Sequence, residues 1–587
     1  MPSRSFRWLL WLLPWLLAAS LAAQNPRTGV LAANASGSAY GPSLASDGDT
    51  AALLYRDDFD ESIQVVLSDG RGLTWSAPVR VDDGTSPAVK QVHDTSVAMA
   101  GQNIYACWTE DRFSLGTRDL YFNRSTDAGI SFQPLDLLID KGSPPGFWDT
   151  PFFRMAVDPQ DPNDANDDLV VILMHVDGGL PPAPDALYLN YSTNSGQTFL
   201  PSAVPVSSHN WQASFFQIDL AVANGIAYAV WLDNLNFGIV ADDCWLSAYD
   251  PLAAVFKVQD LMVNAPTGGF WDADDEPCVD ARGSTVAVLW MRDPVGGPWV
   301  HDLRSNVSLD GGITWMGEVP VGNYTPGLHD VSYPDVAIAA DGNLLAAWQD
   351  NRSGAYEVYS ATSTSSGAGW LNDVQLSSTS MGLSVKLLCP ENQAAAMWNA
   401  GSLPPNFEEA ALSPDAGLSW NSPVVVSTNN GDVDSWAMAY NRYYDNFLMA
   451  WLADDFNPPN NDVYAGGFRP QTLIPIGNFS VPGSTVSFQI AHWPQPDHGM
   501  SFGVVASASL GSYVLADGRD LGIVYDFYFQ QALTMIPGQL SGTINSSGGG
   551  STASFPVPTL PPTLYTTAVA FTSFTNLGAA TDLVPIP

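Results

Sequence analysis

The sequence predicts an all-β protein, in which a β-propeller of four-stranded blades over residues 27–470 precedes a β-sandwich over residues 471–587. Strand-like segments with alternating apolar residues recur at a spacing of about 45–65 residues, which is typical of propeller blades. A short turn motif recurs with them. Both patterns stop near residue 471, and the remaining chain, rich in Ser, Thr, Gly and Pro, favours a separate sandwich.

The turn motif is clearest at residues 308–315 (SLDGGITW), where we expect a tight turn between two strands. The carboxylate of Asp310 can accept backbone N–H bonds, the glycines permit a left-handed backbone, and Trp315 can anchor in a core. The other copies are residues 125–132 (STDAGISF), 413–420 (SPDAGLSW) and 192–199 (STNSGQTF), with weaker ones at 68–75 (SDGRGLTW) and 363–370 (STSSGAGW).

The number of blades follows from an aromatic residue that ends the second strand of each unit. These aromatics are Tyr55, Trp108, Trp231, Trp290, Trp348, Trp398 and Trp451. In one unit, the run of Leu173, Met174 and His175 takes the place of the aromatic. We therefore predict eight blades, with seven as the nearest alternative. The eighth unit lacks a fourth strand, and residues 28–33 (TGVLAA) resemble the fourth strands of other units. We expect this segment to complete the last blade, which would remove an exposed sheet edge.

The chain begins with a segment typical of a secretory signal, which we assign to residues 1–23. Arg4 and Arg7 precede an apolar run that ends in small residues suited to cleavage. No other stretch is long and apolar enough to span a membrane. We expect an exported protein, extracellular or periplasmic, that is monomeric and not inserted in a membrane.

The composition is strongly acidic, with 52 Asp and eight Glu against 21 Lys and Arg and a net charge of −39. This charge excludes nucleic acid and anionic membrane surfaces as partners, because both would be repelled. The four cysteines are Cys107, Cys244, Cys278 and Cys389. Export permits disulfides, and Cys244 and Cys278 could pair, but the spacing does not settle the connectivity.

The turn motifs resemble the Asp-box, or bacterial neuraminidase repeat, of the sialidase superfamily. The matching residues are Ser125, Asp127, Gly129 and Phe132, then Ser308, Asp310, Gly312 and Trp315, then Ser413, Asp415, Gly417 and Trp420. The resemblance covers residues 27–470 and implies that each motif joins the third and fourth strands of a blade, away from the binding cleft. It also implies an exo-acting sialidase-like glycosidase, although the Arg-Ile-Pro signature of those enzymes is absent here.

A first set of candidate ligand-binding residues comes from the second-strand ends and the connections between blades. We expect these segments on the face opposite the turn motifs. Aromatic rings there can stack on sugars, and the acidic residues that follow several of them can accept hydroxyl protons. The alternative is that each Asp pairs with an arginine of a neighbouring blade or caps a turn. The candidates are His93, Trp148, Trp271, His329, Arg112, Arg292 and Arg352.

A second set comes from aligning the first strands on their apolar positions. One column then reads Ser43, Ser96, Arg154, Asp219, Glu276, Asp335 and Ser384. Because first strands line a propeller's axis, carboxylates and an arginine in this column can converge and shift one another's pKa values. We predict that Arg154 binds ligand and that Asp219, Glu276 and Asp335 are candidate catalytic carboxylates for glycoside hydrolysis. The alternative is a hydrated ion-pair cluster that fills the channel.

These motifs require no cofactor, and calcium is the one candidate metal. Asp164, Asn166 and Asp168 have the spacing at which alternate oxygens of a tight loop converge on a hard cation. A solvated acidic loop is the alternative. The sequence thus predicts a secreted protein that binds or hydrolyses extracellular glycans or glycoproteins, or else a noncatalytic recognition or surface-scaffold protein.

Overall fold

The structure is a computed structural model, and it contains no helix among the residues it describes, so none that could cross a membrane. The proposed signal segment (residues 1–23) and the candidates Trp271 and Asp164 lie outside these residues. The described residues are 30–35, 38–68, 70, 72, 74–84, 91–114, 116–139, 144–160, 166–177, 186–208, 217–233, 243–265, 274–293, 300–323, 327–377, 382–401, 406–427, 433–442, 446–454, 461–468, 472–476, 485–491, 500–507, 540–544, 550–552, 555–556, 564–573, 576–580 and 584–586.

The first unit is a propeller of eight four-stranded antiparallel blades, as the second-strand aromatics predict. Blades 1 to 8 are numbered here in the order of their first strands. The first strands are β2 (Ala39–Asp47), β6 (Val92–Ala100), β10 (Asp149–Asp158), β14 (Ile218–Ala223), β18 (Asp274–Arg282), β22 (Val331–Ile338), β26 (Gly382–Leu388) and β30 (Val433–Asn441). The second strands are β3 (Thr50–Asp57), β7 (Asn103–Ser114), β11 (Leu169–Asp177), β15 (Ile226–Asp233), β19 (Thr285–Arg292), β23 (Leu344–Asp350), β27 (Ala394–Ala400) and β31 (Asn446–Asp454).

The fourth strands of the blades are short, with two residues in six of them. The third strands are β4 (Ser62–Ser68), β8 (Thr117–Ser125), β12 (Ala186–Ser192), β16 (Asp243–Asp250), β20 (Asp302–Ser308), β24 (Glu357–Ser363), β28 (Phe407–Ser413) and β32 (Asn461–Phe468). The fourth strands are β5 (Val79–Arg80), β9 (Leu137–Leu138), β13 (Val204–Pro205), β17 (Val255–Met262), β21 (Val319–Pro320), β25 (Val374–Gln375), β29 (Val424–Val425) and β1 (Val30–Ala33).

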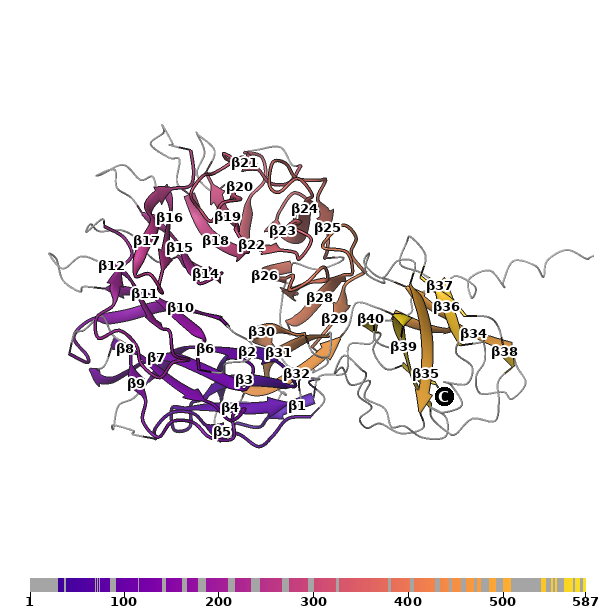
Figure 1. Ribbon diagram of the computed structural model, residues 1–587, viewed down its shortest axis with the longest axis horizontal. Coiled ribbons are helices and arrows are strands. Elements are labelled where there is room, and N and C mark those ends of the chain that lie inside the picture. The colour runs from indigo at the N-terminus through magenta and orange to yellow at the C-terminus, as the bar shows by residue number, and fades with distance from the viewer. Residues whose placement is uncertain are drawn as a thin grey trace, which may run out of the picture. The chain divides into compact units, whose positions relative to one another are not determined.

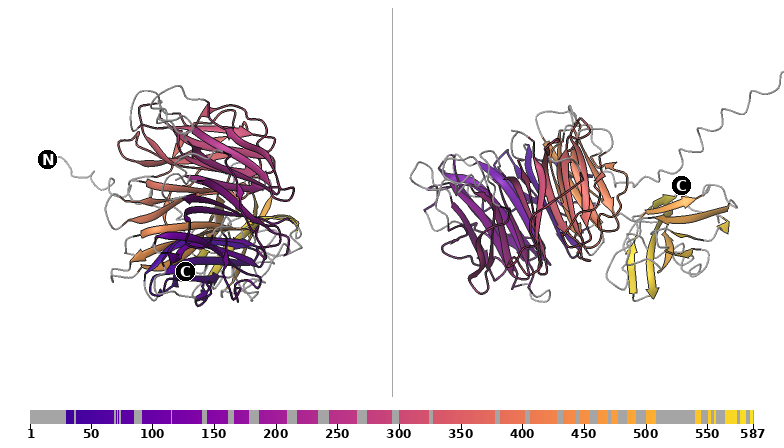
Figure 2. Two further views of the ribbon diagram at one scale, coloured as in Figure 1. Left: turned by 90° about the vertical axis from the view of Figure 1, so that its left-hand side faces the viewer. Right: turned by 90° about the horizontal axis from the view of Figure 1, so that it is seen from above.

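The ring is closed by the N-terminal strand, as the sequence predicts. Strand β1 pairs antiparallel with β32, with Val30 opposite Ala465, and so supplies the fourth strand of blade 8. First strands of successive blades contact one another around the whole ring, including β30 with β2, and they surround the axis (Figure 1). Side views show the blades as twisted sheets packed face to face (Figure 2).

The hydrophobic core lies between the blades. Each of the propeller's described clusters combines buried residues of two adjacent blades; one joins Leu448 and Val463 of blade 8 to Leu53 and Tyr55 of blade 1. The second-strand aromatics that the sequence singled out are buried at these interfaces. Burial of so many large rings between sheets is the main force that holds blades together.

The turn motifs join third and fourth strands in six blades, as the resemblance implies. In residues 125–132, Ser125 Oγ donates to Asp127 (2.7 Å) and accepts the N–H of Gly129 (2.9 Å). Asp127 also accepts the backbone N–H and the hydroxyl of Ser131, at 2.9 and 2.6 Å. The same four bonds recur in residues 308–315 and 413–420, with lengths between 2.6 and 3.0 Å.

The central glycine of each motif brings its blade against the preceding one. A Cβ added at Gly367 of blade 6 would lie 2.2 Å from Cγ2 of Val307 in blade 5, and one at Gly72 of blade 1 would lie 2.7 Å from Leu448 in blade 8. Gly367 also has a left-handed backbone, with φ of 87°. Only glycine satisfies both the conformation and the close approach. The motif therefore allows each blade that carries it to pack closely on the preceding blade.

The second unit follows residue 467 and forms two antiparallel sheets. One sheet has the order β33-β34-β37, with β38 also paired to β34, and the other has the order β36-β35-β39-β40, with β41 paired to β39. They lie in the segment for which the sequence predicts a sandwich. Their strands are β33 (Thr472–Ile476), β34 (Thr485–Ala491), β35 (Ser501–Ser507), β36 (Ser541–Thr543), β37 (Gly550–Ser551), β38 (Phe555–Pro556), β39 (Leu564–Ser573), β40 (Asn576–Ala580) and β41 (Val584–Ile586).

Candidate functional site

Strand register defines which first-strand residues are equivalent around the axis. In each blade one of them pairs with the residue just before the second-strand aromatic or its stand-in. We call this set the lumen ring: Ser43, Ser96, Arg154, Asp219, Cys278, Asp335, Lys386 and Ala437.

The lumen ring corrects the column predicted from the sequence in two blades. Cys278 and Lys386 hold the places that the alignment gave to Glu276 and Ser384. The error is two residues in each blade. Both strands have a β-bulge near their start, between Asp275 and Cys278 and between Leu383 and Lys386, but so does blade 6, where Asp335 was placed correctly. Because side chains of a strand alternate with a period of two, a shift of two residues keeps the apolar pattern, and an alignment on apolar positions does not detect it.

A second ring lies two residues earlier in each blade, on the first strand or, in blade 4, just before it. We call it the bulge ring: Gly41, Asp94, Phe152, Gln217, Glu276, Tyr333, Ser384 and Ser435. Glu276, Tyr333 and Ser384 have φ angles of 45°, 51° and 55°, in the left-handed region. Each non-glycine residue in this region costs about 1–2 kcal/mol. Three adjacent blades thus keep a strained backbone at the same place, which is a pattern found at functional sites.

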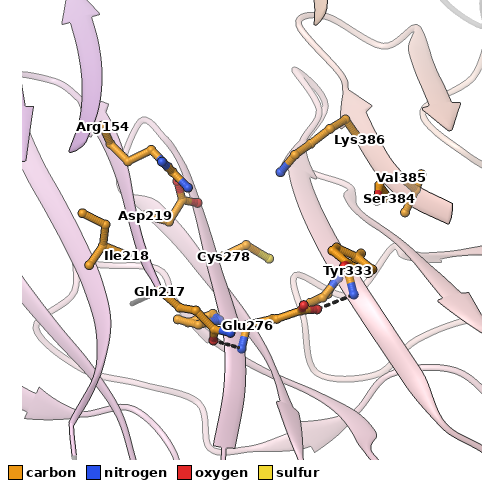
Figure 3. Close-up of a pocket in the computed structure, with 12 residues that line it drawn as sticks. Arg154, Gln217, Ile218, Asp219, Glu276, Cys278, Tyr333, Ser384, Val385 and Lys386 are labelled. Carbon is orange, nitrogen blue, oxygen red and sulfur yellow. Dashed lines mark hydrogen bonds and ion pairs between the residues drawn. The ribbon is translucent and has the colours of Figure 1, made fainter. Parts of the chain in front are cut away.

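These strained residues line a cavity of about 400 Å³ on the axis, which we call the axial pocket. Its walls come from first strands, or the residue just before them, in blades 3 to 7. Arg154 and Lys386 extend into it from opposite sides, and Glu276 and Tyr333 lie beside each other along its edge (Figure 3). The lining residues are Arg154, Gln217, Ile218, Asp219, Glu276, Pro277, Cys278, Tyr333, Pro334, Ser384, Val385 and Lys386. The structure thus brings three of the predicted residues, Arg154, Asp219 and Glu276, into one pocket.

The two cations of the pocket are loosely held. Arg154 Nε lies 3.8 Å from Asp219 Oδ1, and Lys386 Nζ lies 4.0 Å from Asp335 Oδ2. Their side chains are 52% and 64% exposed. Both charges are therefore accessible from the pocket and can form a closer ion pair with a ligand.

Two of the candidate catalytic carboxylates also join adjacent blades. Asp219 Oδ2 accepts the N–H of Val279 in the next blade at 3.0 Å. Asp335 Oδ2 likewise accepts the N–H of Leu387 at 2.8 Å, while its Oδ1 accepts the N–H of Val336 at 3.0 Å. Asp335, which does not line the pocket, is thus committed to backbone bonds. Asp219 keeps Oδ1 toward Arg154 and the pocket.

Glu276 is a half-buried carboxylate that lines the pocket. Its Oε2 accepts the backbone N–H of Tyr333, and its own N–H donates to Gln217 Oε1 at 2.5 Å. Burial raises the pKa of Glu276, while the bond from Tyr333 and the charges of His301 and Lys386 lower it in part. A carboxyl group with a raised pKa can donate a proton or a hydrogen bond near neutral pH.

The predicted rim arginines lie in tight ion pairs within their blades. Arg112 contacts Asp136 at 2.8 Å, Arg292 contacts Glu318 at 2.6 Å, and Arg352 contacts Asp350 at 2.5 Å. Their side chains are only 8%, 12% and 19% exposed. These pairs lie within one blade, but Arg112 also lies 3.6 Å from Asp83, which follows the fourth strand of the preceding blade. This matches the alternative interpretation that these charges stabilise the blades.

The remaining rim candidates also lie outside the axial pocket. His93 is half-buried. Burial lowers its pKa, and the charge of Arg118 lowers it further. Trp148 packs against the core between blades 2 and 3. His329 is half-buried next to Asp330, whose carboxylate instead accepts bonds from His301 (2.8 Å) and the Tyr356 hydroxyl (2.6 Å).

The predicted calcium loop is described only in part. Asp168 is buried and its Oδ2 accepts bonds from Asn103 Nδ2 (2.7 Å) and the Tyr105 hydroxyl (2.5 Å), which link blades 2 and 3. Among the described residues, no group of three or more His, Cys, Asp or Glu side chains could share a metal ion. Calcium binding by Asp164, Asn166 and Asp168 stays a prediction. The four cysteines are buried, and no disulfide joins them in this structure.

Sequence reasoning missed Lys386 and Tyr333. Lysine occurs only four times in the chain, and one copy lies on a first strand, which is a signal that points to Lys386. Nothing in the sequence marks Tyr333, because its exposure depends on the bulge that turns it from the core.

No protein-family model matches the chain, and no curated protein matches it. Similar solved structures include a protein of unknown function from Dyadobacter fermentans (12% identity, 75% of this chain, 98% of that one, TM-score 0.39). An ulvan lyase of a polysaccharide lyase family has 10% identity, over 65% of this chain and 93% of its own, with a TM-score of 0.40. An α-L-arabinanase from Penicillium chrysogenum has 12% identity, over 54% and 92%, with a TM-score of 0.32. We draw nothing about ligand or activity from likeness at this level.

Proposed function

We propose that this protein is an exported glycan-binding propeller, whose axial pocket binds a saccharide through a carboxylate of the sugar. The observation that supports this most is the state of Arg154 and Lys386, which are exposed in the pocket and paired only at 3.8 and 4.0 Å. The arginines of the rim, in contrast, lie in short, nearly buried pairs. In a chain of net charge −39, two loosely paired cations mark where an anionic group can bind.

The rest of the pocket suits a sugar ring. The exposed side chain of Tyr333 offers an apolar face, and the carboxylates of Asp219 and Glu276 can accept or share protons with hydroxyl groups. The turn motifs resemble the Asp-box repeat, but they pack the blades and do not line the pocket, so support for the glycan class comes from the pocket itself.

A glycan array that contains neutral, uronate and sialylated saccharides tests this proposal, followed by calorimetry on the glycans that bind. We expect acidic glycans to bind and Arg154→Ala or Lys386→Ala to weaken binding about 10- to 100-fold, the loss expected for a charged hydrogen bond. Arg442→Ala is the matched control, because Arg442 is exposed and does not line the pocket. Equal binding of neutral and acidic glycans, or no loss in either variant, would reject the proposal.

Hydrolysis of the bound glycan is a second candidate function. It is favoured by Glu276, whose raised pKa suits a general acid and which shares the pocket with Asp219. Release of reducing sugar or sialic acid would show it, and Glu276→Gln should then abolish release while leaving the fold intact. Asp335→Asn is a weaker test, because the Asp335 carboxylate also bonds the next blade. Unchanged turnover in Glu276→Gln would remove that residue from the mechanism.

A further inference from the structure

An exposed aromatic pair lies on blade 2 at the same end of the blades as the axial pocket. Phe113 ends β7, and Phe147 lies in the connection from blade 2 to blade 3; their side chains are 61% and 65% exposed. A Cβ added at Gly146 would lie 3.1 Å from Cβ of Phe113, so the two segments are in close contact. Trp148 continues the aromatic surface, since its ring meets that of Phe147 edge-on at 5.1 Å.

The backbone beneath these rings is held by charged hydrogen bonds. Both carboxylate oxygens of Asp119 accept the N–H of Gly146, each at 2.9 Å. On the other segment, Asp111 accepts the N–H of Gly116 at 3.0 Å. Rings that are exposed to water on a fixed backbone lose little conformational entropy when a ligand covers them.

Strand β10 connects the aromatic pair with the pocket. Asp149, the residue after Trp148, begins β10, and Arg154 lies five residues later on the same strand. Arg118 donates to both oxygens of Asp149, at 2.9 and 2.6 Å. The path from Arg154 to Phe147 therefore follows one strand, with charged groups that can bond hydroxyls at Arg154 and Asp149 and flat apolar rings beyond them.

We propose that the saccharide held in the axial pocket is an oligosaccharide, and that Phe113 and Phe147 form a distal subsite on which a later sugar ring of the same chain stacks. This inference rests on the proposed function. The apolar face of a sugar ring matches a phenyl ring, while its hydroxyl groups match the acidic rim around it. The expected ligand is therefore an acidic polysaccharide that binds along its length, and not a single terminal sugar.

Calorimetry with galacturonate disaccharide and hexasaccharide tests the distal subsite. We expect the wild-type protein to bind the hexasaccharide about tenfold more tightly, and the Phe113→Ala/Phe147→Ala double variant to bind both lengths with the disaccharide's affinity, since loss of one stacking contact is worth about this factor. Ile130→Ala is the matched control: Ile130 is an exposed apolar residue of the same blade, in the turn motif at the other end.

The outcomes separate the two proposals. If the hexasaccharide advantage survives in the double variant, or is absent from the wild type while both lengths bind, the distal subsite is wrong and the axial pocket stands. If the wild type binds neither length, the distal subsite for a uronate chain is wrong, and the glycan array alone then decides the acidic-glycan function. Loss of the advantage in Ile130→Ala as well would also reject the subsite, because the effect would then not be local to the two rings.

Discussion

The turn end and the axial end of the blades differ in how closely their residues repeat from blade to blade. At the turn end, three motifs form the same four hydrogen bonds, with lengths between 2.6 and 3.0 Å, and the glycine of each packs on the blade before it. At the axial end, the lumen ring holds two serines, two aspartates, an arginine, a cysteine, a lysine and an alanine in equivalent places. The turn end is uniform in the blades that carry the motif, because in each of them the glycine meets the preceding blade. The axial end varies because the eight first strands share one lumen.

Backbone strain shows the same contrast. At the turn end, left-handed residues belong to a turn whose hydrogen bonds require them, as at Ser366 (φ 53°). At the axial end, Glu276, Tyr333 and Ser384 are left-handed inside strands, where an extended backbone is otherwise the rule. The first kind of strain stabilises the packing of blades, and the second directs side chains into the axial pocket.

The largest effect that would test this comparison is expected from Gly367→Ala. The new methyl group would lie 2.2 Å from Val307 in a left-handed backbone, so unfolding free energy should fall by about 2–5 kcal/mol. Gly342→Ala in the same blade is the control, because Gly342 is also left-handed (φ 87°) but has no neighbour within 4 Å. Denaturant unfolding followed by tryptophan fluorescence measures both. Equal losses would mean that strain alone, and not packing of blade on blade, explains the conserved turn geometry.

A smaller effect should separate the two kinds of strain. Ser384→Gly and Ser366→Gly both relieve a left-handed serine, with φ of 55° and 53°, and each should stabilise the propeller by up to about 1 kcal/mol. Only Ser384→Gly should weaken binding of an acidic glycan, because only Ser384 lines the axial pocket. Thermal melts and calorimetry on the pair check this. Weaker binding in both variants would mean that strain at the turn end and strain at the axial end do not differ in their effect on binding.

The smallest expected effect concerns pH at the turn end. Hydrogen bonds from Thr314 lower the pKa of Asp310 to about 2, below its usual 3.8. Because the folded-state pKa is lowered, the stabilisation is present above pH 3.8 and is lost as pH falls through 2. Asp310→Asn, which gives the motif the Asn found naturally at Asn194, should be slightly less stable than wild type at pH 7, and the difference should shrink as pH falls from 3.8 through 2. A difference in melting temperature that stays constant between pH 7 and pH 2 would contradict the assigned cause.

The sequence predicted the propeller well because its signals are local and repeated. Buried aromatics such as Trp108 and Trp231 occur once per blade, and the missing fourth strand after Trp451 pointed to residues 28–33. The pocket was predicted only in part. Arg154 and Asp219 fell in the right register, but a shift of two residues keeps the alternation of a strand, so Glu276 was placed where Cys278 lies and Lys386 was missed.

The closure of blade 8 by β1 has a consequence for the order of folding. Val30 of β1 pairs with Ala465 of β32. Strand β1 is synthesised long before β32, so it is among the last strands to find its partner. Such a long-range pairing is slow, because a very large loop has to close before it forms. Chains that end before β32 would leave β1 unpaired and the terminal blades bare on one side. The expected fate of such fragments is association end to end, with each supplying the blade that another lacks.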